Sequence, residues 1–236
     1  MPARERAYHE IKYRILEGRL APGTTLLENE VANLLAMSRT PIREALIKLE
    51  EERLVAVRPR RGFTVLEQSV DDIAEIYEVF STLEVRAARL AASRAQDPAA
   101  LDRLDRLMDQ MERATAKGDI EHWSHLDDVF HADLVALCGN SRLQSTLRTY
   151  WDEQYRVRMA IVRLRPLPTQ SDIEHRSIVA AIRDGDPERA EVLHRRHRDR
   201  ADEQALRLMR QNGGVGRPPG GDAATLSPDG GAAMPS

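Results

Sequence analysis

Aromatic side chains are scarce in this chain of 236 residues and make up only 4% of it. Strands are enriched in aromatic and β-branched residues, so this scarcity disfavours a β-rich core. Cys138 is the only cysteine, which excludes an intramolecular disulfide and is typical of a reducing compartment. Because no run of about 18 apolar residues occurs, we expect neither a transmembrane helix nor a membrane partner. The first residues are charged and lack an apolar signal core, which predicts a cytoplasmic protein.

Helix-forming residues dominate what is present. Alanine, leucine, arginine and glutamate are abundant and 42% of the residues are hydrophobic, which favours a soluble, mainly α-helical protein. The net charge is −3, but it is unevenly distributed: residues 1–66 hold 12 Lys/Arg and 9 Asp/Glu, and the remainder is acidic. This asymmetry indicates a head that faces DNA and a body with another task.

The segment from Met37 to Glu50 predicts a tight turn followed by a short helix with two different faces. Pro41 suits the first turn, where no amide donor is needed. Apolar residues at helical spacing form an inner stripe, namely Ile42, Ala45, Leu46 and Leu49. The opposite face carries Thr40, Arg43, Glu44, Ile47 and Lys48. Arg39 and Arg43 therefore lie where a helix N-terminus can approach a phosphate or a base edge, as in a recognition helix.

The elements around this helix predict a winged helix-turn-helix over residues 1–68. Two further helices precede it, at about residues 4–17 and 28–36, and a Pro-Gly turn lies between them. After Glu52 the pattern changes to apolar residues with strand character, and the polar sequence PRRG between them is typical of a hairpin tip. Three helices followed by a β-hairpin make the winged arrangement.

Several separated motifs of this head occur in one family order: Leu26 and Glu28, SRTPIREAL at 38–46, Leu49 with Glu50, and PRRGFTV at 59–65. In this respect the head resembles the GntR family of bacterial transcription regulators. The resemblance implies that Arg39, Thr40 and Arg43 contact the major groove and its phosphates, where arginine can bond guanine through two atoms. It also implies that the wing tip, with Arg61 and Gly62, approaches the minor groove. The alternative is that these arginines form only a solvated face.

From residue 69 onward the sequence predicts an almost wholly helical domain. Helices are expected at about residues 70–94, 99–116, 119–138, 141–164, 171–183 and 187–211, with turn or capping residues at the breaks. These six helices predict an all-helical bundle over residues 69–211 that is large enough to enclose a pocket. Residues 212–236 are rich in Gly, Pro, Ala and Ser, which predicts a disordered tail.

Four polar residues fall on the inner faces of three of these helices: Asp127, His131, His175 and His197. His194 lies at the edge of the same stripe as His197 and is the main rival to it. One carboxylate and three imidazoles can form an open site for a divalent metal. The alternative is that these histidines are hydrogen-bonded core groups, which inward histidines more often are.

The motifs D-x-x-x-H at 127–131, CGN at 138–140, EH-x-x-I at 174–178 and GD at 185–186 before His197 resemble the FCD ligand-binding domain of the FadR-type branch. The resemblance implies a divalent metal on the Asp and three His, with zinc favoured over nickel or manganese, that anchors a carboxylate effector. The sequence departs from the family at Phe80, where many members carry a pocket arginine four residues before the glutamate found here as Glu84. Arg156 and Arg158 are candidates to supply that charge and bind the effector, or else are surface groups.

The combined pattern predicts a ligand-responsive DNA-binding regulator, with repression favoured over activation. We expect a homodimer that binds an inverted-repeat operator in double-stranded DNA and responds to a small organic or sugar acid. Two alternatives remain. In the first, the metal itself is the signal. In the second, a metal-bound water makes the bundle a hydrolase, with Asp128, Glu174 or Glu121 as its acid or base. No hydrolase motif supports the second, and an enzyme leaves the winged head unexplained.

Overall fold

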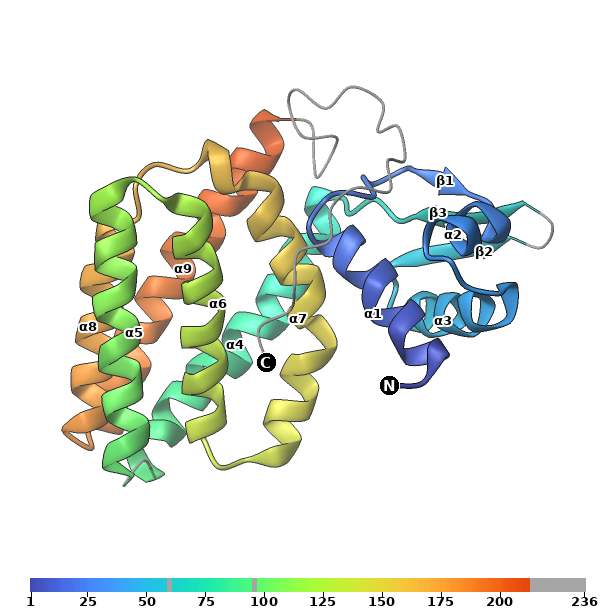
Figure 1. Cartoon of the computed structure of the whole chain (residues 1–236). Coiled ribbons are helices and arrows are strands. Elements are labelled where there is room, and N and C mark those ends of the chain that lie inside the picture. The colour runs from blue at the N-terminus through green and yellow to red at the C-terminus, as the bar shows by residue number, and fades with distance from the viewer. Residues whose placement is uncertain (59–60, 95–96, 213–236) are drawn as a thin grey trace. The chain divides into compact units, whose positions relative to one another are not determined.

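The computed structural model of the chain describes residues 1–58, 61–94 and 97–212 (Figure 1). These residues form two compact units, one that covers Met1–Glu67 and one that begins at Gln68. The first unit contains α1 (Ala3–Leu16), β1 (Thr25–Leu26), α2 (Glu28–Leu34), α3 (Arg39–Glu51), β2 (Val55–Arg58) and β3 (Gly62–Val65). The second contains α4 (Val70–Arg94), α5 (Pro98–Lys117), α6 (Ile120–Leu137), α7 (Ser141–Ile161), η1 (Val162–Leu164), α8 (Thr169–Arg183) and α9 (Pro187–Gln211).

The first unit is the predicted winged helix-turn-helix. The inner stripe predicted for α3 is buried, with Ile42, Ala45, Leu46 and Leu49 each at most 1% exposed. These residues pack with Ile11 of α1 and Phe63 of β3 in one core. Full burial of a large side chain such as Ile42, Leu46, Leu49 or Phe63 stabilises the fold by about 1.5–3 kcal/mol. Packing on this core therefore fixes α3 and leaves its opposite face exposed.

The wing is an antiparallel sheet of strand order β1-β3-β2. The sequence predicted the β2–β3 hairpin but not β1, which is only two residues long and has too few side chains to show an alternating pattern. In β1, Leu26 pairs with Phe63. Gly62 has a φ of 79°, and a Cβ atom there would clash with the backbone of Leu26. Close pairing of β1 with β3 therefore requires glycine at this position.

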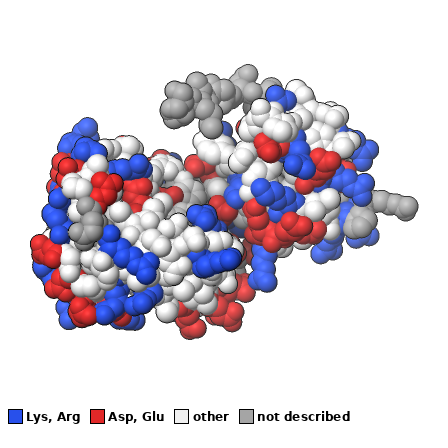
Figure 2. Space-filling view, turned by 90° about the horizontal axis from the view of Figure 1, so that it is seen from below, with Lys and Arg blue, Asp and Glu red and all other residues white. Residues whose placement is uncertain are grey.

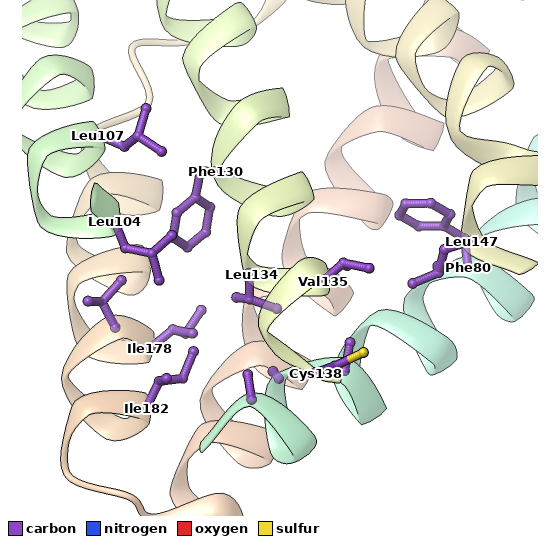
Figure 3. Packing of buried hydrophobic residues seen from close by; sticks show 14 of the residues in the cluster. Phe80, Leu104, Leu107, Phe130, Leu134, Val135, Cys138, Leu147, Ile178 and Ile182 are labelled. Carbon is purple, nitrogen blue, oxygen red and sulfur yellow. The ribbon is translucent and has the colours of Figure 1, made fainter. Parts of the chain in front are cut away.

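Within the described ranges the second unit is a bundle of six α-helices, as predicted. Figure 3 shows its core, where Leu104 of α5, Phe130 of α6, and Ile178 and Ile182 of α8 point toward one another. The predicted helix at 141–164 instead ends as an α-helix at Ile161 and continues as the 3₁₀-helix η1. Pro166 and Pro168 follow closely and cannot donate the hydrogen bonds of a continued helix.

Three predictions concern residues outside the described ranges: the wing-tip residues 59–60, the helix break at 95–96, and the disordered tail, of which 213–236 fall there. They stay predictions. Among the helices that the structure describes, none is both long and apolar enough to span a membrane.

Candidate functional site

Three helices of the bundle each place one buried histidine at the same point. His131 comes from α6, His175 from α8 and His197 from α9, and each is at most 2% exposed. The Nε2 atoms of His175 and His197 lie 3.1 Å apart. One ligand nitrogen from each of the three rings lies within 4.8 Å of the others. The inward direction predicted for these residues is therefore observed, and helix packing brings them together.

Asp127 completes the predicted set from one turn before His131. Its Oδ1 lies 3.5 Å from Nε2 of His131 and 3.6 Å from Nε2 of His175. Its Oδ2 accepts a hydrogen bond of 2.6 Å from Arg158. Arg158 also donates to Asp128 at 2.9 Å and to Gln154 at 2.6 Å. Arg158 therefore fixes the orientation of Asp127, a role that the sequence did not reveal.

Two further carboxylates lie behind the imidazoles. Glu84 Oε1 is 2.8 Å from Nδ1 of His131, and Glu174 Oε2 is 2.7 Å from Nδ1 of His197. Arg200 donates to both oxygens of Glu174. Histidines that bind metals usually have such a carboxylate on the second ring nitrogen, which fixes the tautomer and aims the first nitrogen at the ion. The sequence named both glutamates, but only packing shows this role.

His194, the rival of His197, lies in a different place. It is fully buried, and its Nε2 lies 3.4 Å from Oε2 of Glu84. It forms a second possible ligand group with Glu84 and His131, apart from His175 and His197. His131 belongs to both groups because its two ring nitrogens face opposite sides.

The pKa values in the cluster diverge. Burial disfavours charge on His131, yet the carboxylates of Glu84 and Asp127 outweigh it and raise its pKa to about 9. Burial and the nearby His197 lower the pKa of His175 well below its usual value. Burial, together with His131, does the same to the pKa of His197. His175 and His197 are therefore neutral at pH 7, the state in which an imidazole can bind a metal.

The donor set fits a divalent metal. Two neutral imidazoles, a third imidazole and a carboxylate converge in a buried place, and carboxylates support two of the rings from behind. These are the ligands that zinc, nickel and manganese share. The buried cluster could therefore hold such an ion, and nothing in the donor set selects among the three.

A small cavity of about 30 Å³ adjoins this cluster and has room for about one water molecule. Besides Asp127, His131 and His197, three arginines contribute to its wall: Arg158, Arg165 and Arg198. The guanidinium of Arg198 lies 5.5 Å from the ring centroid of Phe80, so α9 supplies a cation near the position where the family often has one in α4. Arg156, the other predicted effector residue, is 4% exposed but does not line this cavity.

The acids considered for a hydrolase all have partners. Glu121 pairs with Arg163 at 2.6 Å on the surface. Asp128 accepts hydrogen bonds from Trp151 and Arg158. Glu174 is bonded by His197 and Arg200. Each of these carboxylates already has a structural role.

On the first unit, Arg39, Thr40 and Arg43 are exposed together at the N-terminal end of α3, as predicted. The Arg39 guanidinium lies 3.3 Å from Glu28 and keeps 72% of its side chain exposed. Arg61 is exposed on the wing, whereas Gly62 is buried against β1. Figure 2 shows this unit on the right, with Lys and Arg beside Asp and Glu over its visible face. The surface is therefore mixed in charge, and α3 contributes Arg39 and Arg43 to its exposed cations.

Comparison with known proteins agrees with this architecture. Residues 3–65 match the model of the bacterial regulatory proteins of the gntR family, and residues 75–200 match the FCD domain. The chain is 33% identical over 192 residues to an HTH-type transcriptional regulator in an unstable DNA locus of Streptomyces ambofaciens, covering 80% of this chain and 79% of that one. It is 27% identical over 212 residues to the transcriptional repressor RspR of Escherichia coli K12, covering 89% and 92%. Among solved structures, E. coli McbR/YncC has the same fold, with a TM-score of 0.76, 22% identity and coverage of 90% and 99%.

A winged helix-turn-helix joined to a helical bundle is the architecture of a transcription regulator, and the GntR-type domain indicates DNA binding. The chain belongs to the GntR family, with an FCD domain as its C-terminal part. The predicted resemblance is confirmed for both domains; the assignment to the FadR-type branch stays a prediction.

Proposed function

We propose that this protein is a ligand-responsive transcription regulator whose bundle binds a divalent metal and, through it, a small carboxylate effector. The observation that carries this proposal is the convergence of Asp127 and three buried imidazoles beside a cavity lined by arginines. Asp127, His131, His175 and His197 would hold the ion. When bound, the ion supplies a Lewis acid to which a carboxylate can attach. Residues 1–68 would form the DNA-binding domain, and residues 69–211 would form the domain for effector binding and dimerisation.

The DNA-binding part of the proposal uses α3 and the wing. Arg39, Thr40 and Arg43 would contact the major groove and its phosphates, and the exposed Arg61 would approach the minor groove, whereas the buried Gly62 would act by allowing β1 to pair closely with β3. A homodimer would place two such heads on an inverted repeat. Repression is favoured, since the similar protein RspR carries the name of a repressor. The effector acts only if it binds two arrangements of the protein with different affinity.

The size of the cavity supports a second candidate, a regulator for which the metal itself is the signal. A space of about 30 Å³ holds a water molecule but no organic acid unless side chains move. In that case metal binding alone would change operator affinity. The two candidates share the same four ligands and differ in whether an acid is needed.

Elemental analysis of the purified protein and DNA-binding titrations test the proposal. The DNA is a duplex that the protein selects from a random pool, and its affinity is measured with and without metal, across a panel of small acids. A stoichiometric metal and an acid that changes DNA affinity only in the metal-loaded protein would support effector sensing. A change in DNA affinity with metal alone would support metal sensing. DNA binding that responds to neither would contradict both.

A further inference from the structure

Arginines surround the candidate metal site, but most of their charge is already compensated. Arg158 is bonded to Asp127 and Asp128. Arg198 donates to Asp202 at 2.7 Å and to Ser81 at 3.1 Å, and lies 3.4 Å from Glu84. Arg200, just outside the cavity, is bonded to Glu174 and Ser171. These arginines maintain the site and have little free charge for a ligand.

Arg165 differs from them. It follows η1 in the connection to α8, and among the described residues it has no ion pair with any carboxylate. Its guanidinium lies 5.7 Å from the ring centroid of Trp123. That ring is fixed, since Trp123 is 1% exposed, donates to Asp172 at 2.8 Å and stacks on His175 with centroids 6.1 Å apart. Trp123 therefore contacts both Arg165 and a candidate metal ligand, and it holds the guanidinium by a cation–π contact.

Arg165 also lies between two neighbouring spaces. It lines the 30 Å³ cavity together with Asp127, His131 and His197. It also lines a larger pocket of about 290 Å³ together with Gln170, Arg200 and Arg207, and Ser171 is common to both. Arg165 and Ser171 thus form the wall between the two spaces. A ligand that passes from the larger pocket to the imidazoles would therefore pass Arg165.

We propose that Arg165 binds the second carboxylate of a dicarboxylate effector whose first carboxylate lies at the metal. This rests on the proposed function. A planar guanidinium binds a carboxylate through two parallel hydrogen bonds, and partial burial strengthens them. Burial also lowers the pKa of Arg165, so an anionic partner would relieve an electrostatic cost. A monocarboxylate has no second acid group to offset the cost of burying the Arg165 charge. Arg165 therefore makes the site bind dicarboxylates more tightly than monocarboxylates.

The test uses the full-length protein loaded with zinc and titration calorimetry. The probes are succinate and glutarate, and butyrate and valerate are the monocarboxylates of equal chain length. Arg165→Gln removes the charge and keeps some polarity, and Arg165→Met keeps the length over Trp123. Arg163→Gln is the matched control, because Arg163 lies two residues away and is paired with Glu121 on the surface. Metal content and thermal melting are recorded for every variant.

The protein and Arg163→Gln should bind one of the dicarboxylates about 10- to 100-fold more tightly than its monocarboxylate, the range for a charged hydrogen-bonded pair. Either folded Arg165 variant should lose that preference and retain both the metal and the affinity for the monocarboxylate. If a folded Arg165 variant still binds the dicarboxylate more tightly than the monocarboxylate, the role of Arg165 is overturned, while the proposed effector function stands. Absence of metal, or of any acid binding, in the unmodified protein overturns the proposed effector function and this inference with it.

Discussion

The imidazoles of His175 and His197 face each other with their Nε2 atoms 3.1 Å apart, inside the bundle and away from solvent. Two imidazolium ions cannot share this place, and burial lowers the pKa of each ring. At neutral pH both rings are uncharged. A neutral imidazole has one nitrogen that carries a proton and one that carries a lone pair. One of the two Nε2 atoms must therefore donate a hydrogen bond to the other, or both must point their lone pairs at a bound cation.

The first prediction distinguishes the two histidine groups. His131→Ala should lose stoichiometric metal, because His131 belongs to both possible ligand groups. His194→Ala should retain the metal, because His194 contacts Glu84 and lies outside the cluster of His131, His175 and His197. Elemental analysis after dialysis measures both. Metal loss in His194→Ala with retention in His197→Ala would instead place the ion at Glu84, His131 and His194.

The second prediction concerns the stability of the metal-free protein against pH. His175 and His197 have folded pKa values well below 6.5, so below about pH 6.5 the unfolded chain binds more protons and stability falls as pH falls. His131, with a pKa of about 9, has the opposite effect. Its contribution is complete below pH 6.5 and is lost as pH rises toward 9.

Unfolding by urea in the presence of chelator should therefore show a maximum near pH 6.5. Each uncompensated proton contributes a slope of about 1.4 kcal/mol per pH unit. His131→Gln, which cannot titrate, should lose the decline on the alkaline side and keep the acid one. A flat profile between pH 5 and 9 would mean that the cluster does not have these pKa values.

The third prediction tests α3 as the recognition helix. Arg43→Ala should weaken operator binding by about 1–3 kcal/mol and relax specificity at one base pair if the guanidinium contacts a base. A phosphate contact would weaken all sequences alike and flatten the salt dependence. Arg142→Ala, an exposed arginine of the bundle, is the control and should leave DNA affinity unchanged. Fluorescence anisotropy at several salt concentrations separates the cases, and equal affinity for Arg43→Ala and the unmodified protein would remove Arg43 from the interface.

The fourth prediction concerns the wing. Gly62→Ala should destabilise the first unit by more than the roughly 1–2 kcal/mol of a left-handed alanine, because its Cβ would also clash with the backbone of Leu26. Gly118→Ala is the control, since Gly118 has a φ of 70° with open space around it and should cost only the conformational term. Chemical denaturation followed by circular dichroism compares the two. Equal losses would show that the contact with β1 contributes nothing.

The amino-acid sequence alone determined the helices and their inward faces. An apolar stripe that recurs every 3.6 residues can be recognised within one helix. Ile42, Leu46 and Leu49 could therefore be assigned to the buried face of α3, and His131 to the buried face of α6. Turn and capping residues likewise predicted α4 and α9 with the observed ends. These signals need no knowledge of which helices are neighbours.

Which polar atoms meet depends on how the helices pack against one another. The separation of His194 from His197, the support of His131 by Glu84 and the pairing of Arg158 with Asp127 depend on how α4, α6, α7 and α9 pack. Helical period gives the direction of a side chain but neither the rotation nor the height of the facing helix. A shift of one turn would exchange His194 for His197 or separate Arg158 from Asp127. For that reason the sequence could name the inward residues, while packing across distant segments decides which of them meet and leaves Arg165 without an ion pair among the described residues.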